Sequence, residues 1–361
     1  MLKRSIVHHT ILKKSGGAAK VALQLHQGLL EQGHDSQHSF EASEISNDQL
    51  TSPQDAAQAV PENSIVHLHT SKDPALFLRS LAASCKTVIT LHDTQMITGG
   101  CASTMDCPEF ERECSHCPRN FPDSQKVRQE RIAAIVDSEA ILVSPSRWLS
   151  KLVRKVHPAL KPKIIPNGIP WPDRPADKNQ ARRELGLHPA SKVMLFVAHG
   201  GVQAAYKSGP QWKKYWATIK SAVPEALCFA IGGIENSRDG DFISIPYVDS
   251  TTLAKFMSAA DVLAYPTLGD NHPLIILEAM AQSLAVVSYA VGGVVEQISD
   301  GEDGLLIPPY EKTLFTEKVI TLLRHNRTAR EMGSRGFQKG KKRYSHVRML
   351  TDYNKIYDKL V

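Results

Sequence analysis

Two carboxylates separated by seven residues are the feature of this chain that most clearly suggests chemistry. Asp270 follows the apolar, strand-like run 262–265, and Glu278 lies in the apolar run 274–281, which is typical of a helix. The start of such a helix attracts phosphate through unpaired backbone N–H groups and the helix dipole. An ionised carboxylate one turn later offers two acceptor oxygens to the vicinal hydroxyls of a ribose. The spacing predicts a sugar-nucleotide site, and the alternative is an acidic pair that only matches the helix dipole.

The residues at the start of this predicted helix are its candidate phosphate-binding groups. Asn271 is of a type that caps helices, and Pro273 suits a first turn. We predict that Asn271 caps the helix and that backbone amides from His272 to Leu274 hold a diphosphate. Asp270 would then face the sugar or the phosphate, and Glu278 would bind the ribose.

A lysine follows the first predicted strand of the second half of the chain, residues 193–197. Lys207 ends a loop that also contains Gly200 and Gly201. The departure of a nucleoside diphosphate builds negative charge, which a fixed ammonium stabilises more in the transition state than in the ground state. We predict that Lys207 is this cation and that backbone donors at Gly200 and Gly201 share the task. A solvated surface lysine is the alternative.

Two glycines follow the first predicted strand of the chain. Gly16 and Gly17 open a predicted helix over residues 17–32. Glycines at this position let the backbone approach a ligand closely, and the helix start can face a phosphate. The stretch lacks the spacing of the dinucleotide fingerprint, so a nicotinamide cofactor is disfavoured. A tight turn with no ligand is the alternative.

A histidine directly follows another predicted strand, residues 86–91. His92 would lie at the carboxyl end of a parallel sheet, where open α/β sheets bind their ligands. We predict that it orients an acceptor hydroxyl or contacts the transferred sugar. A histidine that caps the strand end by hydrogen bonding is the alternative.

Four cysteines are clustered in the loop 99–121, which has little apolar content. Four thiolates can hold Zn²⁺ tetrahedrally, and a long loop needs something to order it. We predict a structural zinc site, with His116 as an alternative ligand and disulfides or free thiols as the other possibilities. The predicted ligands are Cys101, Cys107, Cys114 and Cys117.

The organisation of the chain predicts two α/β domains. At 361 residues the chain is too long for one ordinary core. Strand and helix signals alternate, which implies parallel sheets with helices on both faces, and the alternation restarts after the proline-rich segment 165–175. We predict an N-terminal domain from residues 1–170 plus 345–361, and a C-terminal domain from residues 171–344.

Composition and charge narrow the class of protein. Hydrophobic residues make up 42% of the chain and charged residues 22%, as in soluble globular enzymes. We find neither an apolar run long enough to span a membrane nor the apolar core of a signal peptide, and expect a cytoplasmic protein. The net charge is +6, with basic residues bunched within 147–163 and 339–343. The first group could rest on the anionic inner-membrane surface, with a solvated face as the alternative, and no nucleic-acid-binding module is recognisable.

The segment from Asp270 onward resembles a known enzyme family. With the runs 285–289, 291–296 and 301–308 that follow, it resembles the C-terminal half of the family 4 retaining glycosyltransferases, glycosyltransferase group 1, which have the GT-B fold. The stretch after Gly16 is similar to their donor-facing loop. The family has two glutamates where this chain has Asp270 and Glu278, and usually an arginine near His199.

The resemblance implies fold and function together. It implies two doubly wound Rossmann-like domains facing each other across a cleft, the first on the acceptor side and the second binding the nucleotide sugar, with a C-terminal helix crossing back to the first. It implies a hexosyltransferase of bacterial polysaccharide type that moves a sugar from a UDP- or GDP-sugar to a glycan or lipid-linked acceptor. The configuration would be retained, with no divalent metal needed for catalysis.

The sequence leaves some alternatives and details open. A nucleotide-sugar epimerase or a phosphorylase of the same fold, and a non-enzymatic zinc-stabilised scaffold, are the other functions. The nucleotide base, the donor sugar, the acceptor, the linkage and the oligomeric state are not specified by these residues.

Overall fold

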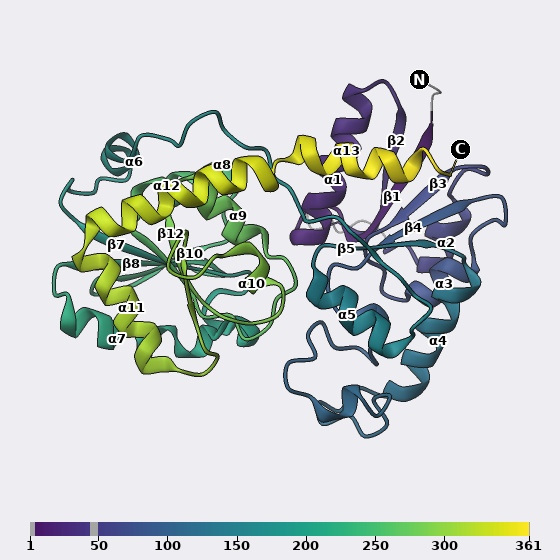
Figure 1. The fold of residues 1–361 in the computed structure, drawn as a ribbon, viewed down its shortest axis with the longest axis horizontal. Helices are drawn as coiled ribbons and strands as arrows, with labels where there is room; N and C mark the ends of the chain where they lie inside the picture. The colour runs from purple at the N-terminus through teal and green to yellow at the C-terminus, as the bar shows by residue number, and fades with distance from the viewer. Residues whose placement is uncertain (1–3, 44–49, 361) are drawn as a thin grey trace. The chain divides into compact units, whose positions relative to one another are not determined.

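The chain forms two compact units in a computed structural model that describes residues 4–43 and 50–360 (Figure 1). Unit 1 consists of Met1–Ile169 with His346–Val361, and unit 2 of Pro170–Ser345. Each unit is a sheet covered by helices on both faces. No helix in the described part of the chain is long and apolar enough to cross a bilayer.

Unit 1 is built on a six-stranded parallel sheet with the order β2-β1-β3-β4-β5-β6. Its core is aliphatic and aromatic, with Val66, Phe77 and Leu149 fully buried. The C-terminal helix α13 packs on α1, where Leu350 leaves no room for a side chain at Gly28. The strands are β1 Ser5–Leu12, β2 Asp35–Ala42, β3 Ile65–Leu68, β4 Lys86–Thr90, β5 Ile141–Ser144 and β6 Lys163–Ile164. The helices are α1 Gly17–Glu31, α2 Pro53–Gln58, α3 Pro74–Arg79, α4 Ser124–Asp137, α5 Arg147–Val156 and α13 His346–Tyr357, with 3-10 turns η1 Gln95–Ile97 and η2 Pro108–Phe110.

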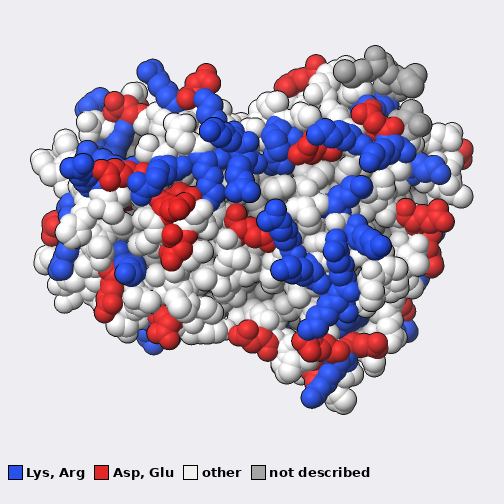
Figure 2. Space-filling view, in the orientation of Figure 1, with Lys and Arg blue, Asp and Glu red and all other residues white. Residues whose placement is uncertain are grey.

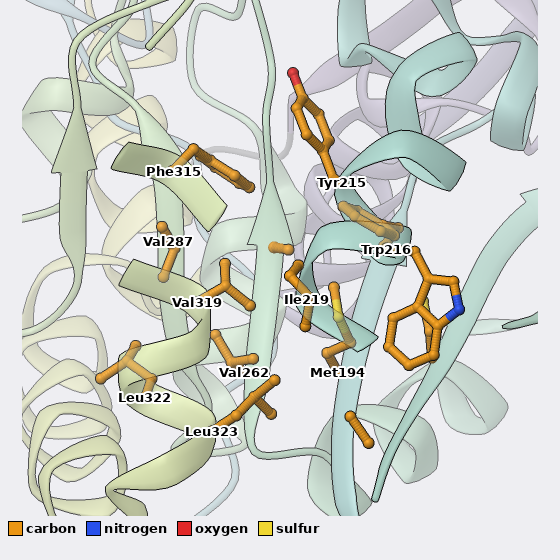
Figure 3. Packing of buried hydrophobic residues seen from close by; sticks show 14 of the residues in the cluster. Met194, Tyr215, Trp216, Ile219, Val262, Val287, Phe315, Val319, Leu322 and Leu323 are labelled. Atoms are coloured by element: carbon orange, nitrogen blue, oxygen red, sulfur yellow. The ribbon is translucent and has the colours of Figure 1, made fainter. Parts of the chain in front are cut away.

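Unit 2 is built on a seven-stranded sheet with the order β13-β12-β11-β7-β8-β10-β9, in which only β9 runs antiparallel to its neighbour. Figure 3 shows α7 and α11 packing Ile219 and Val319 onto Val262 of the sheet. The strands are β7 Lys192–Val197, β8 Ala226–Gly233, β9 Ser237–Asp239, β10 Phe242–Pro246, β11 Val262–Tyr265, β12 Ala285–Tyr289 and β13 Leu305–Ile307. The helices are α6 Lys178–Glu184, α7 Trp212–Ala222, α8 Ser250–Ala259, α9 Leu274–Ala281, α10 Val294–Gln297, α11 Lys312–Arg324 and α12 Asn326–Arg343, with η3 Gly201–Gln203, η4 Ala205–Lys207 and η5 Gly209–Gln211.

Both sheets have the α/β arrangement that the sequence predicts. The helix α12 ends at Arg343 and a separate helix, α13, begins at His346, next to the predicted boundary at residue 345. The chain passes from unit 2 to unit 1 between these helices, and α13 contributes its buried tyrosines to the core of unit 1.

Candidate functional site

Asp270 lies at the centre of a hydrogen-bonded cluster beyond the carboxyl end of β11. Its Oδ2 atom accepts hydrogen bonds from Tyr265 Oη at 2.8 Å and from Thr267 Oγ1 at 2.7 Å. The Lys207 ammonium forms an ion pair with the same oxygen. Two of the residues predicted to act in catalysis, Asp270 and Lys207, are therefore brought into contact.

Lys207 is placed by the loop that follows β7, which winds through three short 3-10 turns. The indole Nε1 of Trp212 donates to the Lys207 carbonyl at 2.9 Å, and Leu268 N donates to the Tyr206 carbonyl at 2.7 Å. The ammonium lies 5.5 Å from the centre of the Tyr265 ring, within the range of a cation–π contact. The side chains of Lys207 and Asp270 are 23% and 16% exposed, so the ion pair is accessible to a solute.

A close backbone contact behind the cluster holds Asp270 in place. Gly293 N donates to the Asp270 carbonyl at 3.0 Å. Gly292 has a φ of 53°, and a Cβ atom built there would lie 2.0 Å from the same carbonyl oxygen. The glycine turn recognised in the sequence therefore supports the carboxylate from behind, and only glycine fits at position 292.

The start of α9 differs from the prediction. The helix begins at Leu274, and Pro273 is its N-cap residue with extended backbone and no side-chain cap. The predictions that Asn271 caps the helix and that Pro273 lies in the first turn are wrong. Gln297 contacts this segment, since its Nε2 donates to the Pro273 carbonyl and lies 3.1 Å from His272 Nδ1. Asn271 and His272 are buried.

Glu278 lies one turn into α9 and is half-buried. Burial raises the pKa of the Tyr265 phenol well above its usual value, and the negative charges of Asp270 and Glu278 raise it further. Tyr265 therefore stays protonated and donates to Asp270. The electrostatic effect of Glu278 on Tyr265 shows that both acidic residues of the pair act on one region of unit 2.

Gly200 lies in the same loop as Lys207 and lines a separate pocket of about 240 Å³. The pocket is also bordered by Gly201, Glu235 and Ser244, all from unit 2. Gly200 and Glu235 follow β7 and β8, so this part of the pocket lies at the edge where open α/β sheets bind ligands, and Ser244 comes from β10.

The other candidates, His92, Gly16 and Gly17, belong to unit 1. His92 directly follows β4, and its Nε2 lies 2.9 Å from Nδ1 of His69. Burial lowers the pKa of His92 to about 4 and raises that of its neighbour Asp93 to about 6. Because its pKa is lowered, the imidazole of His92 is neutral at pH 7.

Gly16 is the N-cap residue of α1, with a φ of 89°.

The predicted zinc ligands Cys101, Cys107, Cys114 and Cys117 are free thiols, and Cys101 and Cys114 are buried. Within residues 4–43 and 50–360 they do not form a group of side chains close enough to hold a metal. The alternative ligand His116 has an exposed ring beside Glu109.

Hydrogen bonds from arginine and serine order the cysteine loop. Arg128 of α4 donates to the Phe110 carbonyl at 2.6 Å, Arg119 to the Ser103 carbonyl at 2.6 Å, and Ser124 Oγ to the Cys114 carbonyl at 2.6 Å. These hydrogen bonds order the loop, so a metal is not needed for that purpose. Zinc at these thiols stays a prediction.

Sequence reasoning missed two parts of the site region. Tyr265 and Thr267 flank the proline after β11, and nothing in their spacing singles them out from core and loop residues. His8 and His67 were missed as partners because histidines inside strands are usually buried core residues. Their signal was present, since both occupy matching positions in strands that pair in the sheet.

One segment of the chain matches a known family of enzymes. Residues 239–339, which include Asp270 and Glu278, match the model of "Glycosyl transferases group 1". The chain is 26% identical over 259 residues to D-inositol 3-phosphate glycosyltransferase of Mycobacterium marinum, covering 66% of this chain and 51% of that protein. It is 26% identical over 251 residues to alpha-maltose-1-phosphate synthase of Mycolicibacterium smegmatis, covering 62% of this chain and 64% of that protein. The segment that carries both acidic residues therefore matches the group 1 glycosyltransferase family.

The fold of the chain is the expected GT-B fold. Sucrose-phosphate synthase of Thermosynechococcus elongatus superposes with a TM-score of 0.76 at 17% identity, covering 99% of both chains. HepE of Anabaena in complex with UDP-glucose superposes with a TM-score of 0.73 at 15% identity, covering 98% of this chain and 99% of that chain. The chain spans about half the length of the mycobacterial inositol phosphate glycosyltransferase that it matches.

Proposed function

We propose that this protein is a retaining glycosyltransferase that moves a sugar from a nucleoside diphosphate to an acceptor hydroxyl. The observation that carries the proposal is the Lys207–Asp270 ion pair beyond β11, followed by α9 with Glu278 one turn along. Unit 2 binds the nucleotide sugar, and unit 1 provides the acceptor side. In unit 1, Gly16 and Gly17 face the donor, and His92 orients the acceptor hydroxyl or contacts the transferred sugar.

Lys207 stabilises the departing diphosphate. A terminal phosphate gains negative charge as the sugar leaves, and an ammonium already held by Asp270, Thr267 and the Tyr265 ring needs little reorganisation to meet it. The first N–H groups of α9, from Leu274 onward, add donors, because the first N–H groups of a helix have no partner within it. The N–H groups of Gly200 and Gly201, which the sequence predicted as further donors, are already used, since they donate to the carbonyls of Gly232 and Ala198.

Asp270 positions the sugar and does not attack it. Three donors share its Oδ2 atom, which disperses the charge that a nucleophile would need. This arrangement supports retention by attack on the same face, in which the leaving phosphate takes the proton of the acceptor hydroxyl. No divalent metal takes part in this step.

Glu278 binds the two ribose hydroxyls of the donor. UDP- and GDP-sugars are the donors that we propose to test first. HepE, a structural neighbour, binds UDP-glucose, which supports a uridine donor. We propose a polysaccharide or a lipid-linked glycan as the product, because unit 1 has a basic surface around α5.

A basic surface on unit 1 supports an acceptor held at an anionic membrane. Figure 2 shows lysine and arginine side chains gathered over the region of α5. Lys151 and Arg154 project from the exposed face of this helix. Binding to vesicles of phosphatidylglycerol and phosphatidylcholine should fall in the double variant Lys151→Glu/Arg154→Glu and not in Lys318→Glu, which lies in unit 2. Equal binding by all three proteins would contradict the membrane role.

The predicted zinc site is tested by metal analysis of protein purified without added zinc. About one equivalent of zinc that is lost in Cys107→Ser would support the site. Fully folded protein without zinc would refute it. The proposed transfer reaction does not pass through this metal.

The decisive experiment for the function is a donor screen with the full chain. UDP-, GDP- and ADP-sugars are incubated with the protein, and release of nucleoside diphosphate and thermal stabilisation are measured. We expect the sugar nucleotides of one base to raise the unfolding temperature of the protein. We also expect slow hydrolysis of that donor, which releases its nucleoside diphosphate. Both effects should be lost in Asp270→Asn. NMR of the product tests retention directly.

The screen also separates the other functions. An epimerase would convert the sugar without releasing the nucleotide, and a phosphorylase would consume inorganic phosphate. A scaffold would neither bind nor turn over any donor, and its biological role would survive Asp270→Ala and Glu278→Ala. Any of these results would overturn the proposal.

A further inference from the structure

Four histidines form a continuous array at the carboxyl edge of the unit 1 sheet. His8 lies in β1 and His67 in β3, where they are paired across the two strands. His69 and His92 directly follow β3 and β4. His8, His67 and His69 are buried, and His92 is half-buried.

Three of these rings are joined by imidazole-to-imidazole hydrogen bonds. His92 Nε2 lies 2.9 Å from His69 Nδ1, and His69 Nε2 lies 3.1 Å from His8 Nδ1. His8 Nε2, at the far end, is buried without a hydrogen-bond partner among the described residues. The chain of bonds therefore has a defined inner end.

His67 stands beside this chain with both nitrogens occupied by hydroxyl groups. Its Nδ1 lies 2.7 Å from Tyr357 Oη, and its Nε2 lies 2.7 Å from Thr90 Oγ1. Tyr353 Oη lies 2.8 Å from the same threonine oxygen. The helix α13 thus packs the array from one side and fixes the ring of His67.

The four rings are neutral at pH 7. Burial lowers the pKa of His8 to about 3 and that of His92 to about 4, and it lowers those of His67 and His69 well below the usual value. A neutral imidazole carries one proton and one lone pair. Since both nitrogens of His69 are bonded to other imidazoles, it must donate with one nitrogen and accept with the other.

The unpartnered Nε2 of His8 decides the direction of donation in the row of hydrogen bonds from His8 to His92. A proton on His8 Nε2 would leave a buried N–H donor without an acceptor, which is costly and rare in folded proteins. With the proton on Nδ1 instead, His8 donates to His69 Nε2, and His69 Nδ1–H donates to His92 Nε2. His92 must then carry its own proton on Nδ1.

We propose that His8 and His69 are positioning residues that fix His92 as the Nδ1–H tautomer. This inference rests on the proposed function for its consequence. With its only lone pair accepting from His69, His92 cannot remove a proton from an acceptor hydroxyl. It acts as a hydrogen-bond donor that orients an oxygen of the sugar or the acceptor, which leaves the leaving phosphate as the proton acceptor.

The tautomer is read directly by long-range ¹⁵N–¹H correlation NMR of ¹⁵N-histidine-labelled full-length protein at pH 7. The signals of His92 are assigned by their absence in His92→Asn. We expect a bare Nε2 and a protonated Nδ1 in the wild type. A protonated Nε2, or a doubly protonated ring, would overturn the proposal.

Two substitutions of His8 test the cause. The side-chain NH₂ of His8→Asn can occupy the place of imidazole Nδ1–H, so this variant should keep the His92 tautomer. His8→Leu has no donor, so His92 should become a mixture of tautomers. An unchanged tautomer in His8→Leu would overturn the role of His8. If His8→Leu fails to fold, the wild type and His8→Asn still show in which direction the histidines donate their hydrogen bonds.

The same cluster could instead bind a metal, because His8, His67 and His69 are the described side chains gathered closely enough to hold one. A transition metal present in one equivalent and lost in His8→Leu would overturn the proposal, since the metal would replace the protons. The NMR measurement needs no donor and no turnover. A wrong tautomer and an absent transferase activity are therefore distinguishable results.

Discussion

At the scale of single residues, the contact between Lys207 and Asp270 makes their contributions to catalysis interdependent. We expect Lys207→Ala to reduce kcat by about 10²–10³-fold, the range seen when one preorganised donor to a developing charge is lost. Steady-state kinetics with the donor identified by the screen measures this. The matched control is Lys213→Ala, a nearby exposed lysine paired with Asp239. A rise in KM with unchanged kcat would contradict a transition-state role.

Glu278 is predicted to act on binding and not on turnover. Glu278→Ala should weaken the binding of the nucleoside diphosphate by about 1–3 kcal/mol, because the ribose hydroxyls lose their acceptor in a partly buried site. Calorimetric titration with the diphosphate alone measures this, without a sugar or an acceptor. Glu317→Ala on the exposed side of α11 serves as the control. If both variants bind equally well, the ribose assignment is wrong.

At the scale of elements, the turn before α10 decides where Asp270 points. Gly292→Ala would place a Cβ atom against the Asp270 carbonyl, so the loop before α9 must shift. We expect it to lower stability by about 1 kcal/mol or more, as for other glycines with positive φ, and to lower activity further than stability accounts for. Thermal unfolding and kcat/KM are compared.

Gly301→Ala is the matched control for this turn. Gly301 also has a positive φ, of 76°, but a Cβ atom there meets nothing within 4 Å. It therefore carries the backbone strain without the collision. Equal losses of activity in the two variants would show that strain alone, and not the position of Asp270, is responsible.

The elements that the sequence reveals are those with regular apolar periodicity. The runs at β11 and α9 are almost wholly buried, so their pattern alone predicts them. The strand β2 does not stand out, because its residues are mostly polar and its two buried residues, Ser36 and Glu41, are polar as well. The helix α12 contains Gly333 and Gly340, which disfavour a helix locally. They are needed because Ser283 and Trp171 approach the helix too closely for any side chain.

In the candidate site, the sequence could predict only those residues that follow the end of a predicted strand. Asp270, Lys207 and His92 were found because they follow predicted strands. His69 could not be found in this way, since it meets His92 only through the pairing of β3 with β4. Tyr265 and Thr267 lie close to Asp270 in the sequence, but their residue types do not show that they donate to it. The contacts of the segment before α9 could not be predicted either, because Gln297, which donates to the Pro273 carbonyl, belongs to another helix, α10.

At the scale of the whole molecule, the two units differ in what their interiors are made of. The core of unit 2 in Figure 3 is built from aliphatic and aromatic side chains. Unit 1 contains a set of histidines whose pKa values are lowered by burial. They are His8, His9, His26, His34, His67, His69 and His92. The unfolded chain binds protons at these groups below pH 6.5, while the folded unit does not.

This difference predicts that acid unfolds unit 1 first. A histidine with a lowered pKa stabilises the fold fully above its unfolded value, and the stabilisation is lost as the pH falls below about 6.5. At pH 5 the loss is about 2 kcal/mol for each of His8 and His92, and His67 and His69 act in the same direction. Asp93 opposes them, because its pKa is raised to about 6 and its contribution is lost as the pH rises toward that value.

The histidines outnumber this one carboxyl, and His8 and His92 together account for about 4 kcal/mol, a large share of the about 5–15 kcal/mol that stabilises a typical domain. Hydrogen exchange between pH 5 and 8, corrected for intrinsic exchange rates, should therefore show protection lost in β1, β3 and β4 while β7, β11 and β12 remain protected. His8→Asn should shift the unit 1 transition to lower pH, since a buried amide does not bind a proton. Simultaneous loss of protection in both units, or an unchanged transition in His8→Asn, would mean that the buried histidines do not set the acid stability.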